Sequence, residues 1–220
     1  MNFSFTEISG KRQHSRAISV CAYMSDKFDA DKHLKPFAEF VTKGHEGYDI
    51  LVFREPGMSV PVGPTTRVFD VTSPTLGYGR HLWRYLGGEL GYDWTWFRGM
   101  DTPEVPAREE RLALATELVR NHAVIWQCPN RRPLTVMGRC GTTLLGGKSL
   151  AAFVQKSAFD HQDWNCDEHL LTDWLHTEQP RVTLALDGPL TNKPHQLSWV
   201  LSQLCEGQHL TVVKDRDDRN

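Results

Sequence analysis

The chain has 220 residues, of which 40 % are hydrophobic and 24 % are charged, and its formal net charge is −2 at pH 7. This length suffices to bury one sizeable core, so we expect a single domain over residues 1–220. The near-neutral charge excludes a global electrostatic attraction to nucleic acid or to anionic lipid.

Cysteine usage and the lack of long apolar runs indicate a cytoplasmic protein without a membrane partner. The five cysteines are an odd number and form no Cys-x-x-Cys pair. They therefore indicate neither a disulfide framework nor a zinc ribbon, and a reducing compartment fits best. No stretch approaches the roughly 20 apolar residues of a membrane span, and residues 1–10 form a polar arm without the apolar core of a signal peptide.

Short apolar runs and helical spacing alternate through the first hundred residues. We expect strands at 17–24, 48–54, 66–71 and 94–100, helices at 28–41 and 78–86, and a Pro- and Gly-rich loop at 56–64. The β-α-β opening predicts an α/β fold of the Rossmann type, with a mainly parallel central sheet flanked by helices. In such a sheet the ligand lies at the carboxyl ends of the strands.

Three polar or aromatic residues follow the first expected strand. Tyr23, Ser25 and Asp26 fall at its carboxyl end. We therefore expect them to contact a bound nucleotide.

The second half of the chain continues the alternation less clearly. We expect helices at 107–122, 150–155 and 194–204, strands at 123–127 and 133–137, an edge strand at 209–214, and a Gly-rich loop at 141–149. That loop ends in Gly147-Lys148-Ser149, which suggests a P-loop nucleotide kinase as a rival hypothesis. A P-loop also needs glycine at position 142, which is Thr142.

The stretch 81–102 carries the most informative pattern in the chain. Trp83-Arg84-Tyr85 lies in the expected helix, and the apolar strand that follows reads Trp94-Thr-Trp-Phe-Arg-Gly-Met-Asp101-Thr. This order resembles a family of nucleotide-sugar glycosyltransferases with the GT-A fold, in which a Trp-Arg-Phe/Tyr helix precedes a strand ending in Arg-Asp-Leu-Asp-Ser. Cys166-Asp167-Glu168-His-Leu-Leu171 is similar to the Asp-Gln/Glu-x-x-Leu helix start of that family, and the resemblance covers about residues 68–176.

The resemblance implies a role for the carboxylate at the strand end. Asp101 would face the diphosphate of the donor, with a divalent cation, Mn²⁺ or Mg²⁺, as cofactor, because hard cations prefer oxygen ligands. Gly99 replaces the first acidic residue of the family's Asp-x-Asp pair, so metal dependence and catalytic competence are open. Read without the resemblance, Asp101 before Thr-Pro is a turn residue or a helix cap.

The resemblance also implies roles for residues farther along the chain. Asp167, with Glu168 in reserve, would remove the proton from the acceptor hydroxyl, although carboxylates in a first helical turn also serve as caps. Arg84 and Arg98 would contact the donor phosphates, since a guanidinium matches phosphate geometry, or would be paired for structure. His195 would be a further metal ligand, and a surface-loop histidine is the alternative.

The resulting functional prediction is a glycosyltransferase that moves a sugar from a nucleotide-diphosphate donor to a hydroxyl acceptor. The acceptor would be a glycan or a hydroxymethylated base of phage DNA, in a bacterial or phage-infected cytosol. Arginines at positions 12, 16, 131 and 132 favour the DNA base, whereas the overall charge opposes it. A degenerate transferase fold that binds nucleotide or glycan without turnover is the non-enzymatic alternative, motivated by Gly99.

Overall fold

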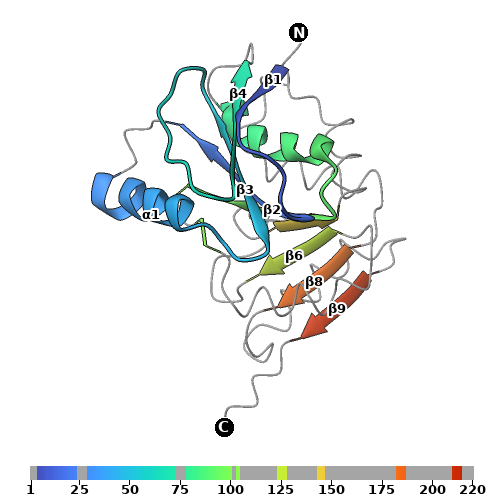
Figure 1. The fold of residues 1–220 in the computed structure, drawn as a ribbon. Coiled ribbons are helices and arrows are strands. Elements are labelled where there is room, and N and C mark those ends of the chain that lie inside the picture. Colours follow the sequence, from blue (N-terminus) through green and yellow to red (C-terminus); the bar gives the residue numbers. More distant parts are fainter. Residues whose placement is uncertain are drawn as a thin grey trace.

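The computed structural model describes residues 4–23, 29–72, 78–100 and 103–104, together with the backbone of four later strands. Its nine strands form one sheet in the order β1-β4-β3-β2-β5-β7-β6-β8-β9 (Figure 1). The strands are β1 (Ser4–Ser9), β2 (Arg16–Ala22), β3 (Tyr48–Arg54), β4 (Thr66–Thr72), β5 (Trp94–Arg98), β6 (Ala123–Gln127), β7 (Thr143–Gly146), β8 (Val182–Leu186) and β9 (Leu210–Lys214). The first half of the chain thus folds as an α/β unit around a mostly parallel sheet.

Strand directions divide the sheet into parallel blocks. β4, β3, β2 and β5 pair in parallel, and so do β6, β8 and β9. β7 is antiparallel to both β5 and β6, and β1 is antiparallel to β4. The carboxyl ends of all strands except β1 and β7 therefore lie at one edge of the sheet, which we call the carboxyl edge; the opposite edge is the amino edge.

Helices cover both faces of the first block, which explains why its strands are almost continuously apolar. Helix α1 (Lys35–Lys43) continues a π-helical turn, η1 (Ala30–Leu34), and buries Phe37, Phe40 and Val41. These side chains pack against Ile18 and Val20 of β2 and their neighbours on β3 and β5. We call this side of the sheet the α1 face.

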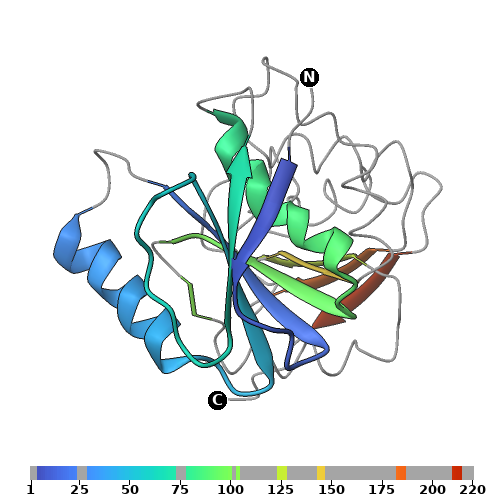
Figure 2. The same cartoon turned by 45° about the horizontal axis from the view of Figure 1, so that its top comes forward.

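The opposite face is covered by η2 (Tyr78–Leu90), a long 3₁₀ helix, as Figure 2 shows. The hydroxyl of Ser19 on β2 donates a hydrogen bond to the backbone carbonyl of Arg84 on η2. Gly87 approaches β3 so closely that a Cβ there would lie 3.0 Å from Leu51 Cδ1. Alternate residues of β2 and β3 therefore face η2, and the others face α1.

The structure confirms most of the strands and helices expected in the first half. β3 has the expected limits, β2, β4 and β5 agree within two residues, and the expected helices correspond to η1 with α1 and to η2. β6 and β9 also lie where the sequence places strands. No helix among the described residues has the length and apolar character needed to cross a bilayer.

Two expectations were wrong. Residues 4–9 were expected to be a polar arm, but they form β1, because they pair with β4 and Phe5 packs edge-on against the stacked rings of Phe53 and Phe69. Residues 143–146 were expected in a loop, but they form β7, which hydrogen-bonds to strands on both sides. The expected strand 133–137 and the helices 107–122, 150–155 and 194–204 lie outside the described residues.

Candidate functional site

The strand order reverses next to β2. The chain proceeds outward from β2 to β3 and β4, and then returns to place β5 on the other side of β2. In an open parallel sheet, such a reversal leaves a crevice outside the carboxyl ends of the two strands, where nucleotides and similar ligands bind. The junction of β2 and β5 at the carboxyl edge is therefore the candidate site.

Two of the residues expected to bind a nucleotide border this junction. Val20 of β2 lies opposite Arg98, the last residue of β5, and Tyr23 directly follows β2. Arg98 is buried and Tyr23 is half-buried. Ser25 and Asp26 follow β2 along the chain, and Asp101 follows β5, but all three lie outside the described residues.

A second arginine lies on the same face as Arg98, on the far side of β2. By strand alternation Arg98 shares the α1 face with Trp94 and Trp96, and Arg54 at the end of β3 shares it with Ile50 and Val52. From standard strand spacing and a two-residue offset in register, the two arginine Cα atoms lie roughly 12 Å apart. Positive side chains thus flank the carboxyl end of β2.

Arg54 belongs to an ion pair that sequence reasoning missed. Its Nε lies 2.6 Å from Oδ1 of Asp70 on β4, and its Nη1 donates to the carbonyl of Met58. Both side chains are partly exposed. The signal that identifies them is a charged residue at the carboxyl end of each apolar strand, Phe53-Arg54 and Phe69-Asp70.

Arg84 is not brought together with Arg98. It lies on η2, on the opposite face of the sheet, and its guanidinium lies 5.4 Å from the ring centroid of Tyr85. Its side chain is buried, and its carbonyl is fixed by Ser19. The backbone carbonyl of Arg84 therefore joins η2 to β2, and the expected contact of Arg84 with donor phosphates stays a prediction.

The helix that follows β2 already has its first amides occupied. Oδ1 of Asp29 accepts hydrogen bonds from the amides of Asp31 and Lys32, at 3.0 and 2.9 Å. The amide of His33 donates to the backbone carbonyl of Asp29. A phosphate that bound at this helix start, as it does in dinucleotide folds, would have to displace a carboxylate.

The residues expected to act in catalysis and metal binding lie elsewhere in the chain. Asp167, Glu168 and His195 are outside the described residues, as is Asp101. Within the described part of the chain, no three His, Cys, Asp or Glu side chains come together as a metal site. The expected metal ligands, Asp101 and His195, therefore stay predictions from the sequence.

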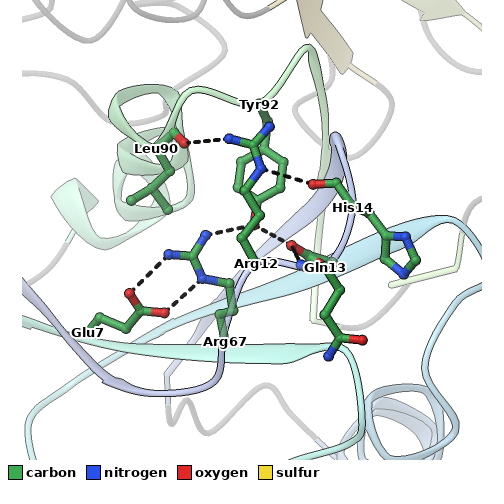
Figure 3. A network of polar contacts seen from close by, with 8 residues as sticks. Glu7, Arg12, Gln13, His14, Arg67, Leu90 and Tyr92 are labelled. Carbon is green, nitrogen blue, oxygen red and sulfur yellow. Dashed lines mark hydrogen bonds and ion pairs between the residues drawn. The ribbon is translucent and has the colours of Figure 1, made fainter.

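A buried polar network occupies the amino edge, on the η2 face (Figure 3). The hydroxyl of Tyr92 accepts a hydrogen bond from Arg67 Nη1 at 2.7 Å and donates one to Asp49 Oδ2 at 2.6 Å. Arg67 also forms a bidentate pair with Glu7, at 2.7 and 2.9 Å. Asp49 is fully buried, and both of its oxygens accept from the amide of Gln13.

The pKa values of two side chains in this network, Tyr92 and Arg67, are raised. Burial raises the pKa of the Tyr92 hydroxyl well above its ordinary value, and the bond to Asp49 adds to this rise, while Arg67 opposes it. The bond to Glu7 raises the pKa of Arg67, although burial opposes that change. Tyr92 is thus neutral and Arg67 charged at every physiological pH.

Two of the arginines that favour a DNA acceptor make internal contacts at this amino edge. The guanidinium of Arg12 lies 4.6 Å from the ring centroid of Tyr92, and Arg12 Nε donates to the carbonyl of His14. The guanidinium of Arg16 lies 5.9 Å from the ring centroid of Tyr48. Along β2, four residue steps, or roughly 13 Å, separate Arg16 from Val20, which lies opposite Arg98 at the candidate site. Arg131 and Arg132 lie outside the described residues.

The strand β7 also bears on the P-loop hypothesis. A phosphate cradle needs the backbone amides between Thr142 and Gly147 to point at the ligand. Residues Thr143–Gly146 instead pair with β5 on one side and β6 on the other. Lys148 and Ser149 lie outside the described residues.

Comparison with known proteins adds no family assignment, since no protein-family model and no curated protein sequence matches this chain.

Proposed function

We propose that the chain is a GT-A-like glycosyltransferase that binds a nucleotide-diphosphate sugar at the junction of β2 and β5 and transfers the sugar to a hydroxyl acceptor. The observation that supports this proposal is the reversal of strand order at that junction. The two candidate donor-binding segments lie at the carboxyl ends of these strands: 23–26 follows β2, and 98–101 begins with the last residue of β5. Motif and topology therefore point to the same edge of the sheet.

In this proposal the donor spans the carboxyl end of β2. Tyr23 contacts the nucleoside, and Arg98 and Asp101 face the diphosphate. Arg54 and Asp70 border the same edge. Arg54 offers hydrogen-bond donors, and Asp70 offers hydrogen-bond acceptors, to the polar groups of the nucleotide. The occupied helix start at Asp29 leaves the phosphate charge to side chains rather than to backbone amides.

A divalent cation, if used, would be held by Asp101, the donor diphosphate and water, with His195 as a further ligand. Its chemistry would be to neutralise the diphosphate leaving group. Asp167, with Glu168 in reserve, would take the proton of the acceptor hydroxyl. The acceptor is a glycan or a modified DNA base; the internal contacts of Arg12 and Arg16 reduce the support for DNA.

A thermal-shift screen over nucleotide sugars, each with and without Mn²⁺, tests the proposal. We expect one donor to raise the melting temperature of wild type and of Arg16→Gln, but not of Arg98→Gln, with each shift measured from that variant's own value. Arg16→Gln is the matched control because it removes the same charge at the amino edge. Equal stabilisation of all three proteins would place the donor elsewhere.

Turnover separates the enzyme from the degenerate binding fold. Release of free nucleoside diphosphate in the presence of acceptor hydroxyls supports the transferase. Donor binding without release of nucleoside diphosphate would assign the chain to the non-enzymatic alternative. That alternative is based on Gly99, which leaves a single carboxylate where the family has two.

A further inference from the structure

The amino-edge network consists of two parts that belong to different segments of the chain. Arg67, Tyr92 and Asp49 lie on or next to the strands β4, β5 and β3. Glu7 and Arg12 lie on the N-terminal segment that comprises β1 and the residues up to position 13, which we call the arm. β1 pairs with the outer side of β4, and Glu7 and Arg12 of the arm contact Arg67 and Tyr92 (Figure 3).

Each part is balanced in charge by itself. Within the sheet, the cation Arg67 and the anion Asp49 are joined through the hydroxyl of Tyr92. To this network the arm contributes one anion, Glu7, and one cation, Arg12, whose guanidinium lies 4.6 Å from the ring centroid of Tyr92. Removing the arm therefore leaves no net charge in the buried interior, which avoids the large penalty of a buried unpaired ion.

The contacts that hold the arm lie along one side of the sheet. Besides the β1–β4 ladder, they include the edge-on contacts of Phe5 with Phe53 and Phe69 and the ion pair of Glu7 with Arg67. Gln13 contributes its amide to Asp49 and its side-chain amide to the carbonyl of Pro64, and Arg12 Nη1 donates to the carbonyl of Leu90 at 3.4 Å. The ladder itself is interrupted by a register shift between Glu7 and Ser9. By contrast, β2 is buried between two parallel neighbours and two helices.

We propose that the arm is a latch that opens and closes as a unit while the rest of the sheet stays folded. Opening removes Glu7 and Arg12 together and leaves Arg67, Tyr92 and Asp49 bonded to one another. It uncovers the edge of β4 and removes the arginine that contacts the last carbonyl of η2. The latch thus couples the N-terminal segment to the helix that connects β4 with β5.

Native-state hydrogen exchange of the full-length chain tests the latch. We expect the hydrogen-bonded amides between β1 and β4 to exchange through an opening that denaturant accelerates less steeply than global unfolding, because the opening exposes less surface, whereas those of β2 and β3 exchange only through global unfolding. Glu7→Gln should accelerate the β1–β4 amides about tenfold, as the loss of one charge-assisted bond would, and leave β2 and β3 unchanged. Glu39→Gln, an exposed residue on α1, is the matched control and should change neither group.

A second variant tests the division into two parts. Asp49→Asn disturbs the inner part, so it should accelerate exchange in β2 and β3 as well as in the arm. Two outcomes would overturn the proposal. One is that Glu7→Gln accelerates the arm, β2 and β3 together; the other is that the β1–β4 amides of the wild-type protein exchange at the same rate and with the same denaturant dependence as β2 and β3.

Discussion

Replacing Tyr92 by phenylalanine removes one buried oxygen atom from the amino-edge network and leaves the ring in place. That oxygen accepts from Arg67 at 2.7 Å and donates to Asp49 at 2.6 Å, and the tyrosine side chain is 2 % exposed. The substitution therefore breaks two hydrogen bonds to charged groups. Water cannot replace them without entering the core.

The expected loss follows from what remains bonded. A hydrogen bond to a charged group contributes about 1.5–3 kcal/mol, but Asp49 keeps the amide of Gln13 and Arg67 keeps Glu7. We therefore expect Tyr92→Phe to lower the free energy of unfolding by about 3 kcal/mol and the melting temperature by roughly 6–12 °C for a chain of this length. Urea denaturation monitored by tryptophan fluorescence measures the first quantity.

The pH dependence of the same variant gives an independent check. Folding raises the pKa of Tyr92, so its stabilising contribution is complete below the unfolded value of about 10 and is lost as pH rises above it. Phenylalanine does not titrate, so the variant has no such loss. The difference in free energy of unfolding between wild type and variant should therefore narrow above about pH 10. If Tyr92→Phe lowers the free energy of unfolding by less than about 1 kcal/mol at pH 7, the two hydrogen bonds do not contribute as the structure indicates. The same conclusion would follow if the difference in free energy of unfolding widened above about pH 10.

Three further substitutions probe the arm and the candidate site. Gly10→Ala should lower the free energy of unfolding by more than about 1 kcal/mol, because its Cβ would lie 2.3 Å from the carbonyl oxygen of Thr66 at a φ of +97°; Gly57→Ala, at a φ of +79° in open space, is the control and should cost less. Asp101→Asn should abolish donor-dependent turnover without changing the melting temperature, and near-normal turnover would remove this residue from the site. Asp167→Asn should lower turnover by about 10²- to 10⁴-fold with donor affinity unchanged; an equal loss of donor affinity in calorimetry would make it a donor-binding or structural residue.

Strands that carry a strong local signal were predictable from the sequence. β3 is a continuous apolar run bounded by a glycine before it and a Pro-Gly loop after it, so both of its ends were found. β1 was missed because only Phe5 is held in an aromatic cluster, and its partners Phe53 and Phe69 are distant in sequence. β7 was missed because its last residue is Gly146 and further glycines lie nearby at positions 141 and 147, and its pairing with two strands distant in sequence outweighs that local signal.

The candidate site was predictable in part for the same reason. The parallel opening of the chain predicts that residues such as Tyr23 lie at the ligand edge, and this needs only the direction of the strands. The order of the strands in the sheet depends on tertiary pairing, which the sequence pattern does not give. The ion pair of Arg54 with Asp70, which lie opposite each other on β3 and β4, was therefore not identified. The amino-edge network was not predicted from the sequence either. Asp49 and Arg67 lie inside apolar strand patterns, and they are joined only through the hydroxyl of Tyr92.

In the proposed function, a nucleotide-diphosphate sugar binds at the carboxyl edge between β2 and β5. Amide chemical-shift mapping of the full-length protein, during titration with the donor found in the screen, locates the bound sugar nucleotide. We predict the largest changes at residues 20–23 and 98–100, with little change at residues 12–16 and 91–94 of the amino edge. Changes confined to the amino edge, or no changes at saturating donor, would show that the donor does not bind between β2 and β5.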